Sequence, residues 1–186
     1  MFVFGYGSLL WNPGFAFDER LPALAVGWTR RWCVASTVHR GTPARPGCVL
    51  GLVPGGECVG AAYRLPEGSE DEALRYLHER EMCEAGYRME TIGLMTPAGR
   101  VPAVCYVADR PSPPADLALA IRTAKGVSGT NREYAEKAAA AVAELRLMPG
   151  WPPACPGFDP GFLVQCGVPS ATDAIGAKNC SLAAMS

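Results

Sequence analysis

Short runs of apolar and β-branched residues, separated by glycine and proline, dominate the first half of the chain and return between residues 89 and 108. Such runs are typical of β-strands, and the glycines and prolines between them indicate turns, for example at 41–47 and 54–56. The predicted strands are residues 2–4, 31–35, 48–53, 58–65, 89–95 and 101–108. Because they are short, irregularly spaced and rarely separated by helices, they favour an antiparallel or mixed barrel over a doubly wound sheet.

Three segments have helical patterns, which makes the predicted fold class α+β. The first begins at Ser69, where Ser-Glu-Asp-Glu fits a capping box, and continues to residue 82 or 83, before Gly86. The second spans about residues 115–125. The third begins with a similar box at Thr130 and continues to about Met148. Its apolar side chains recur at the spacing of a helix packed on a core: Tyr134, Ala138, Ala141, Val142 and Leu145.

The end of the chain differs in composition from the rest. Pro149 stops the third helix, and the following residues to Ser186 are rich in proline and glycine, with three charged side chains and no clear periodicity. We therefore predict a domain at 1–148, which is long enough for a sizeable core, and a loosely packed or disordered extension at 149–186.

The composition argues against several classes of function. The chain has 186 residues, 49% of them hydrophobic, and a formal net charge of −1, which gives no sign of binding to nucleic acid or an acidic membrane. No apolar run approaches the roughly 18 residues of a membrane-spanning helix, and no signal peptide is visible, so we expect a cytoplasmic protein. The eight cysteines include no Cys-x-x-Cys pair and there are two histidines, so we predict reduced thiols and no metal site.

The first candidate site is the sequence Gly5-Tyr6-Gly7-Ser8, which follows the apolar run at residues 2–4. Glycines on both sides of one residue let the backbone turn tightly and approach a ligand closely, because no Cβ stands in the way. Successive backbone N–H groups in such a turn can bind an anion such as a carboxylate. An ordinary turn after a strand fits these residues at least as well. A dinucleotide-binding loop is disfavoured, because Leu10 stands where its third glycine would be.

The second candidate is Glu81, a carboxylate on the apolar face of the first helix. Four residues separate it from Leu77, so both side chains should lie on the stripe that faces the core. Partial burial would raise the pKa of Glu81 toward the range that suits general acid–base catalysis. An ion pair with an arginine such as Arg88 at a frayed helix end is an equal alternative, and Glu84 is a rival carboxylate. The other charged residues of the helix are predicted to face solvent: Glu72, Arg75, Glu79 and Arg80.

Nucleophilic catalysis by the protein has weaker support. Ser8 and His39 could act together, but nothing in the sequence orients them. Cys33 or Cys83 as a thiol nucleophile is similarly unsupported. Polar residues also concentrate at 36–41, after a predicted strand, where a turn that satisfies its own backbone explains them.

Several ordered motifs resemble the ChaC-type, glutathione-specific γ-glutamylcyclotransferases. The match begins with Phe-Gly-Tyr-Gly-Ser-Leu-Leu-Trp at 4–11 and spans about residues 1–148. Further matching segments are 30–32, 36–43, 46–47, 60–65, 76–81, 86–88, 126–129 and 131–134. Several motifs in order are far more specific than any one of them. The resemblance implies a small mixed β-barrel flanked by helices, in agreement with the strand pattern.

The resemblance also implies roles for particular residues. Glu81 corresponds to the catalytic glutamate of the family. The residues that correspond to the loop holding the γ-glutamyl group are Tyr6, Gly7, Ser8 and Leu9, preceded by Val3, Phe4 and Gly5. Tyr134 could contact the substrate through its hydroxyl group or simply be an aromatic residue of the core.

The implied reaction is intramolecular aminolysis of glutathione, in which the α-amine of the substrate attacks its own γ-carbonyl and releases 5-oxoproline and Cys-Gly. This reaction needs no enzyme nucleophile and no cofactor, and the implied partner is a small-molecule substrate. The alternatives are a cyclotransferase acting on other γ-glutamyl amines or amino acids, a non-catalytic γ-glutamyl-binding module, and a thiol-dependent amidohydrolase.

Overall fold

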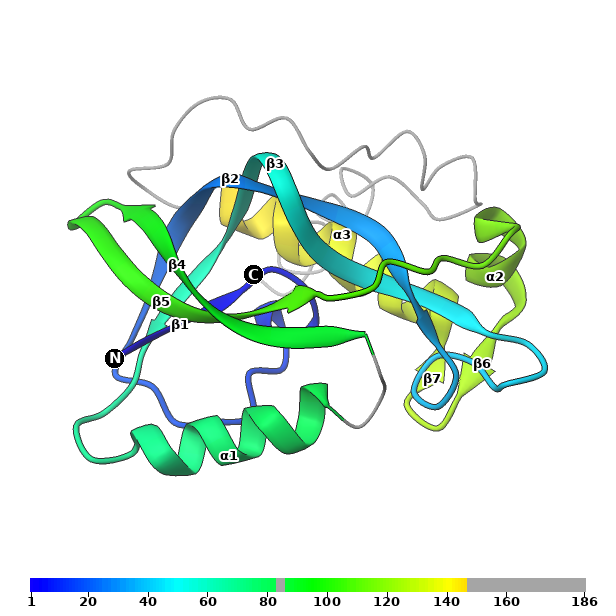
Figure 1. Ribbon diagram of the computed structural model, residues 1–186, viewed down its shortest axis with the longest axis horizontal. Helices are drawn as coiled ribbons and strands as arrows, with labels where there is room; N and C mark the ends of the chain where they lie inside the picture. The colour runs from blue at the N-terminus through cyan, green and yellow to red at the C-terminus, as the bar shows by residue number, and fades with distance from the viewer. Residues whose placement is uncertain (83–85, 147–186) are drawn as a thin grey trace, which may run out of the picture.

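A closed barrel of five strands, with helices packed on its outside, forms the part of the chain that the computed structural model describes, residues 1–82 and 86–146 (Figure 1). Its elements are β1 (Phe2–Gly5), η1 (Ser8–Leu10), β2 (Glu19–Ser36), β3 (Gly47–Arg64), α1 (Glu70–Glu81), β4 (Tyr87–Thr96), β5 (Gly99–Ala108), α2 (Leu117–Thr123), β6 (Lys125–Gly126), β7 (Gly129–Thr130) and α3 (Asn131–Arg146). The strand order is β1-β3-β2-β4-β5. Among the five described barrel strands, only β1 and β5 pair in parallel, and this pairing closes the barrel between Val3 and Val104. The predicted α+β fold with a small mixed barrel is confirmed.

The long pairing of β2 with β3 corrects the predicted break at 54–56. Instead of turning the chain back, Gly55 and Gly56 adopt positive φ angles of 107° and 73° within β3. They lie opposite Gly27, where the register shifts between the two strands. An irregularity of this kind increases the local twist of a strand pair. The two strands therefore bend around the barrel where the proline and glycines predicted a turn.

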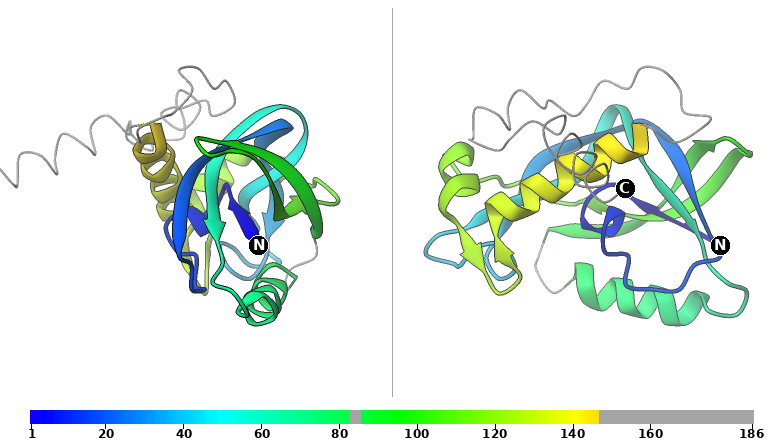
Figure 2. Two further views of the ribbon diagram at one scale, coloured as in Figure 1. Left: turned by 90° about the vertical axis from the view of Figure 1, so that its left-hand side faces the viewer. Right: turned by 180° about the vertical axis from the view of Figure 1, so that it is seen from behind.

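Both faces of β1 are buried, which explains its unbroken apolar sequence. Because successive side chains of a strand point to opposite faces, Phe4 enters the barrel core with Leu52, whereas Val3 packs in a second apolar layer. Leu77 of α1 and Leu145 of α3 belong to that outer layer. The two helices lie on different sides of the barrel (Figure 2). β1 thus leads into the following loop from a fixed position between the two layers.

Of the two predicted N-terminal helix caps, the structure contradicts the first and confirms the second. The side chain of Ser69 does not cap α1, because its Oγ donates to the carbonyl of Pro66 at 2.8 Å. Thr130 does cap α3, since its Oγ1 accepts from the N–H of Glu133 at 3.1 Å. The apolar positions predicted to face the core from α3 are all buried: Tyr134, Ala138, Ala141, Val142 and Leu145.

The region before α3 also differs from the prediction. Asp116 caps α2 by accepting from the N–H of Leu119, and the helix ends at Thr123, so it is shorter than expected. β6 and β7 then form a small two-stranded ribbon that the sequence pattern did not predict. Among the described residues, no helix is long and apolar enough to cross a membrane. The predicted domain boundary at 148 and the extension at 149–186 lie outside the described residues.

Candidate active site

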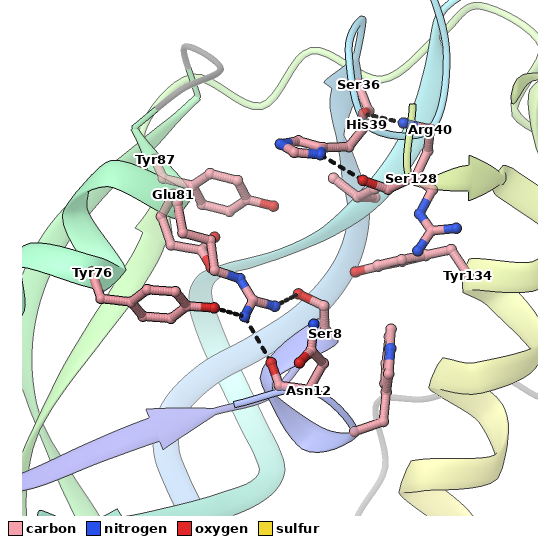
Figure 3. Close-up of a pocket in the computed structure, with 13 residues that line it drawn as sticks. Ser8, Asn12, Ser36, His39, Arg40, Tyr76, Glu81, Tyr87, Ser128 and Tyr134 are labelled. Carbon is pink, nitrogen blue, oxygen red and sulfur yellow. Dashed lines mark hydrogen bonds and ion pairs between the residues drawn. The ribbon is translucent and has the colours of Figure 1, made fainter. Parts of the chain in front are cut away.

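A cavity of about 300 Å³ opens where the loop after β1, the end of α1 and the start of α3 meet (Figure 3). This volume is at the lower end of the roughly 300–1,000 Å³ typical of small-molecule sites. Its lining residues are Ser8, Trp11, Asn12, Ser36, His39, Arg40, Val49, Tyr76, Arg80, Glu81, Tyr87, Ser128 and Tyr134. A cavity of about 30 Å³ adjoins it, and Ser8, Glu81, Tyr87 and Tyr134 line both.

One edge of β3 fixes two tyrosines in the cavity wall. β1 pairs only with the far end of β3, so nearer the start of β3 the same edge bonds to side chains. Asn131 continues the ladder: its Oδ1 accepts from the N–H of Cys48 at 2.6 Å, and its Nδ2 donates to the Cys48 carbonyl at 2.7 Å. Two residues along, the N–H of Leu50 donates to Tyr134 Oη at 3.2 Å, and its carbonyl accepts from Tyr87 Oη at 2.7 Å. Because buried backbone groups require partners, these bonds hold both hydroxyl groups in place.

Glu81 is the last residue of α1, and its side chain is only 17% exposed. Burial raises the pKa of its carboxyl group, and the guanidinium of Arg80, with Nε 3.3 Å from Oε1, partly opposes that rise. The partial burial expected from helical spacing is therefore present. The alternative, an ion pair between Glu81 and an arginine at the helix end, is also present, but its partner is Arg80. Arg88 pairs with Glu90 and Asp109 instead.

Two buried tyrosines, Tyr6 and Tyr134, and the partly buried Tyr87 line the smaller cavity with this carboxylate. Burial is the main cause that raises the pKa of Tyr6, Tyr87 and Tyr134, and the charge of Glu81 raises each pKa further. All three therefore keep their phenolic protons at neutral pH. Tyr6 and Tyr87 donate to backbone carbonyls at 2.7 Å each, whereas Tyr134 accepts from a backbone N–H. The proton of Tyr134 is thus not used in its bond to the barrel.

The loop between β1 and η1 is held from inside the barrel. Arg30, which is 5% exposed, donates from Nε to the carbonyl of Tyr6 at 2.7 Å. A Cβ on Gly7 would lie 3.3 Å from the hydroxyl oxygen of Tyr134, so glycine lets the loop approach that group closely. The first N–H groups of a helix have no partner within it, so the start of η1 can offer donors to a bound anion.

Arg80 does not face solvent, which corrects the prediction from helical spacing. Its side chain is 17% exposed and joins α1 to the loop after β1. Nη1 donates to the carbonyl of Asn12 at 2.7 Å and to Tyr76 Oη at 3.0 Å, and Nη2 donates to Ser8 Oγ at 2.9 Å (Figure 3). Together with its contact to Glu81, these bonds connect the carboxylate to the glycine-containing loop.

The turn after β2 forms the wall on another side of the cavity. His39 Nδ1 lies 2.8 Å from Ser128 Oγ in the turn between β6 and β7. Arg40, which is 8% exposed, lies over the ring of Tyr134 at 5.5 Å from its centre. The N–H of Arg40 donates to Ser36 Oγ at 2.9 Å, as expected for a turn that satisfies its own backbone. The sequence did not predict that this turn also lines the cavity.

The other candidate nucleophiles receive no support from the geometry. Ser8 and His39 both line the cavity, but Ser8 bonds to Arg80 and His39 to Ser128. Cys33 packs in a separate apolar cluster, and burial raises the pKa of its thiol. Cys83 and Glu84 lie outside the described residues.

The residues predicted to form the binding loop have different surroundings. Phe4, Tyr6, Gly7, Ser8 and Leu9 line the smaller cavity. Val3 and Gly5 are not among the described residues that line either cavity. Within residues 1–82 and 86–146, no group of three histidine, cysteine, aspartate or glutamate side chains is placed to hold a metal ion.

The fold and the cavity define a class of β-barrel protein with a buried carboxylate beside a glycine-containing loop. The chain belongs to the ChaC-like protein family, whose model matches residues 1–149.

Individual relatives agree with this assignment. The chain is 38% identical over 142 residues to the glutathione-specific γ-glutamylcyclotransferase of Escherichia coli (strain K12), an alignment covering 72% of this chain and 62% of that protein. It is 39% identical over 163 residues to γ-glutamylcyclotransferase 2-3 of Arabidopsis thaliana, covering 78% of this chain and 81% of that protein. The crystal structure of a yeast γ-glutamyl cyclotransferase specific to glutathione has the same fold. It matches with a TM-score of 0.74 at 24% identity over 89% of this chain and 93% of that one. The chain thus spans less than two thirds of the E. coli relative.

Proposed function

We propose that the protein is a γ-glutamylcyclotransferase that converts glutathione into 5-oxoproline and Cys-Gly. The observation that carries this proposal is Glu81, a largely buried carboxylate with a raised pKa that lines both cavities beside the loop after β1. Both relatives are named γ-glutamylcyclotransferases, and the name of the E. coli relative, which is glutathione-specific, supports the choice of substrate. Four described cysteines are free, buried thiols, which suits the cytoplasmic location that we also propose.

Glu81 acts in this mechanism as the base and then as the acid. The α-ammonium of the substrate cannot attack, so Glu81 first removes one of its protons. The resulting amine attacks the γ-carbonyl and forms the C–N bond of the 5-oxoproline ring. The γ-amide C–N bond then breaks as Glu81 returns the first proton to the departing cysteinyl nitrogen. Glu81 then takes the second proton from the ring nitrogen and passes it to the released amine, so that 5-oxoproline leaves as a neutral lactam and Cys-Gly with an ammonium group. Because burial raises its pKa, the carboxyl group is better suited to hold a proton between these transfers than an exposed glutamate is.

The remaining residues hold the substrate in the conformation that reacts. Nucleophile and electrophile belong to one molecule, so much of the barrier is removed by orientation. The N–H groups at the start of η1 bind either the α-carboxylate or the oxyanion that develops on the γ-carbonyl oxygen. Tyr134 donates its unused proton to the same group, since its hydroxyl oxygen faces Gly7 across a short gap.

The alternatives predict different substrates or chemistry. A cyclotransferase for γ-glutamyl amino acids would use γ-glutamyl-alanine at least as well as glutathione. A non-catalytic binding module would be stabilised by glutathione without releasing 5-oxoproline. A thiol-dependent amidohydrolase acting through Cys33 has little support, because that thiol is buried in a separate cluster.

The test is release of 5-oxoproline and Cys-Gly from millimolar reduced glutathione by the wild-type protein and by Glu81→Gln. We expect release by the wild type, and loss of release with retained glutathione binding in the variant. Glu79→Gln is the matched control, because Glu79 lies on the exposed face of the same helix. An active Glu81→Gln variant would exclude Glu81 as the acid–base group.

A further inference from the structure

The cavity has a second polar end, on a different side from Glu81 (Figure 3). His39, Arg40 and Ser128 form it, and the cyclotransferase mechanism described above does not use them. His39 and Ser128 come from two separate turns, which the hydrogen bond between their side chains connects. A further bond, from the N–H of Ser128 to the carbonyl of His39 at 3.0 Å, fixes the two turns against each other. These hydrogen bonds therefore hold this end of the cavity in a fixed geometry.

The charge at this end is positive. Glu133 Oε2 lies 3.8 Å from Arg40 Nη1, while Glu133 Oε1 lies 2.7 Å from Lys137 Nζ. One carboxylate is thus shared between two cations, and one positive charge of this group remains unbalanced. Arg40 is almost fully buried at the cavity wall, where its Nη1 also donates to the carbonyl of Thr130 at 3.2 Å. Its only carboxylate partner among the described residues is the shared Glu133, and a buried charge with incomplete compensation is costly. A negatively charged group of a ligand would lower that cost.

We propose that His39, Arg40 and Ser128 bind the terminal carboxylate of the dipeptide that leaves, and so select γ-glutamyl peptides over γ-glutamyl amino acids. This inference rests on the proposed function. With the γ-glutamyl group placed at Glu81, the Cys-Gly part of glutathione extends across the cavity and ends in a carboxylate. The guanidinium group supplies the charge, and the imidazole and the hydroxyl group supply hydrogen bonds to its oxygens.

The selection follows from the length of the substrate. A γ-glutamyl amino acid carries its terminal carboxylate one residue nearer to the reacting bond, a difference of roughly 3.3–3.6 Å in an extended chain. That is longer than a hydrogen bond can stretch, so such a substrate cannot satisfy both ends of the cavity at once. The positive end thus favours substrates in which the distance between the scissile bond and the terminal carboxylate matches that of a γ-glutamyl dipeptide.

The first test varies the substrate and leaves the protein intact. Glutathione, its glycine amide and γ-glutamyl-alanine are compared by the kcat/KM for 5-oxoproline release from the wild-type protein. We expect kcat/KM for the amide to be lower by about tenfold to a hundredfold, the loss expected for a hydrogen bond to a charged group. Equal use of glutathione and its amide would overturn the proposed carboxylate site, while turnover of glutathione would still support the cyclotransferase.

The second test asks whether the effect belongs to these residues. Arg40→Gln and His39→Gln should lower kcat/KM for glutathione by a larger factor than kcat/KM for the glycine amide, and equal losses for both substrates would overturn the proposed site. A variant that merely unfolds would lose both activities equally, and Ser128→Ala, at an exposed position, is a milder substitution of the same site. If the wild type turns over neither substrate, calorimetric binding of glutathione and its amide to the intact protein decides: equal affinity for the two refutes the site.

Discussion

Replacing Asn131 with alanine should destabilise the protein and impair the cavity wall at the same time. The Asn131 side chain is fully buried and pairs with both backbone groups of Cys48, so it acts as a short substitute strand on the edge of β3. Tyr134 lies three residues along the same helix and bonds to Leu50 on the same edge. Loss of the hydrogen bonds between Asn131 and Cys48 should therefore weaken the bond between Tyr134 and Leu50.

The size of the effect follows from the two groups that lose their partners. A buried N–H or C=O left without a partner costs about 1–3 kcal/mol, so the Asn131→Ala variant should lose about 2–6 kcal/mol of its free energy of unfolding. Even about 3 kcal/mol is a large part of the roughly 5–15 kcal/mol typical of a domain.

Equilibrium unfolding in urea measures this loss, with Arg132→Gln as the control on the next residue. That change breaks only the exposed pair of Arg132 with Glu136, which should contribute less than about 0.5 kcal/mol. We also expect 5-oxoproline release per folded molecule to fall in Asn131→Ala but not in Arg132→Gln. If Asn131→Ala is as mild as the control, the side chain does not act as a substitute strand and the reasoning is refuted.

Three further substitutions test the electrostatics of the site. Arg80→Gln removes a charge that lowers the pKa of Glu81, so the rise of kcat/KM with pH should move to higher pH; an unmoved profile would show that Glu81 is not the titrating base. Glu81→Gln should raise the free energy of unfolding at pH 7, because burial penalises the charged carboxylate in the folded state. Urea titrations should show no such gain below about pH 4, where the Glu81 carboxyl is neutral in the folded and the unfolded state. An equal gain at pH 7 and below pH 4 would contradict the penalty on the charged carboxylate. Tyr134→Phe leaves the N–H of Leu50 unpaired and should cost about 1–3 kcal/mol by the same urea assay. It should also lower kcat more than it changes KM, and a variant with unchanged kcat would remove Tyr134 from the mechanism.

The sequence predicted correctly those elements that are determined by residues close together in the chain. The turn at 97–98 between β4 and β5 and the start of α3 at Asn131, which Thr130 caps, follow from short stretches of residues. The burial of Glu81 also follows from local information, because helical spacing from Leu77 determines which face it occupies. The carboxylate at the centre of the candidate site was therefore predictable without knowledge of the tertiary structure.

Features that depend on topology were not predictable in this way. Spacing within α1 places Arg80 off the apolar stripe, yet it is buried because Asn12 and Ser8, from a distant loop, supply its partners. The roles of Tyr87 and Asn131 depend on which edge of β3 remains without a neighbouring strand. The order of strands around the barrel determines that edge, and no local pattern records it.

The position of β1 has a consequence for how the protein is made. β1 leaves the ribosome before both strands that flank it, and Val3 meets Val104 of β5 only after about 100 further residues have been synthesised. A nascent chain, or a fragment that lacks β5, contains the sequence of the glycine loop but has nothing to hold β1 on that side. The glycine loop therefore reaches its fixed position only after the synthesis of β5, which also supplies Tyr106 to the smaller cavity.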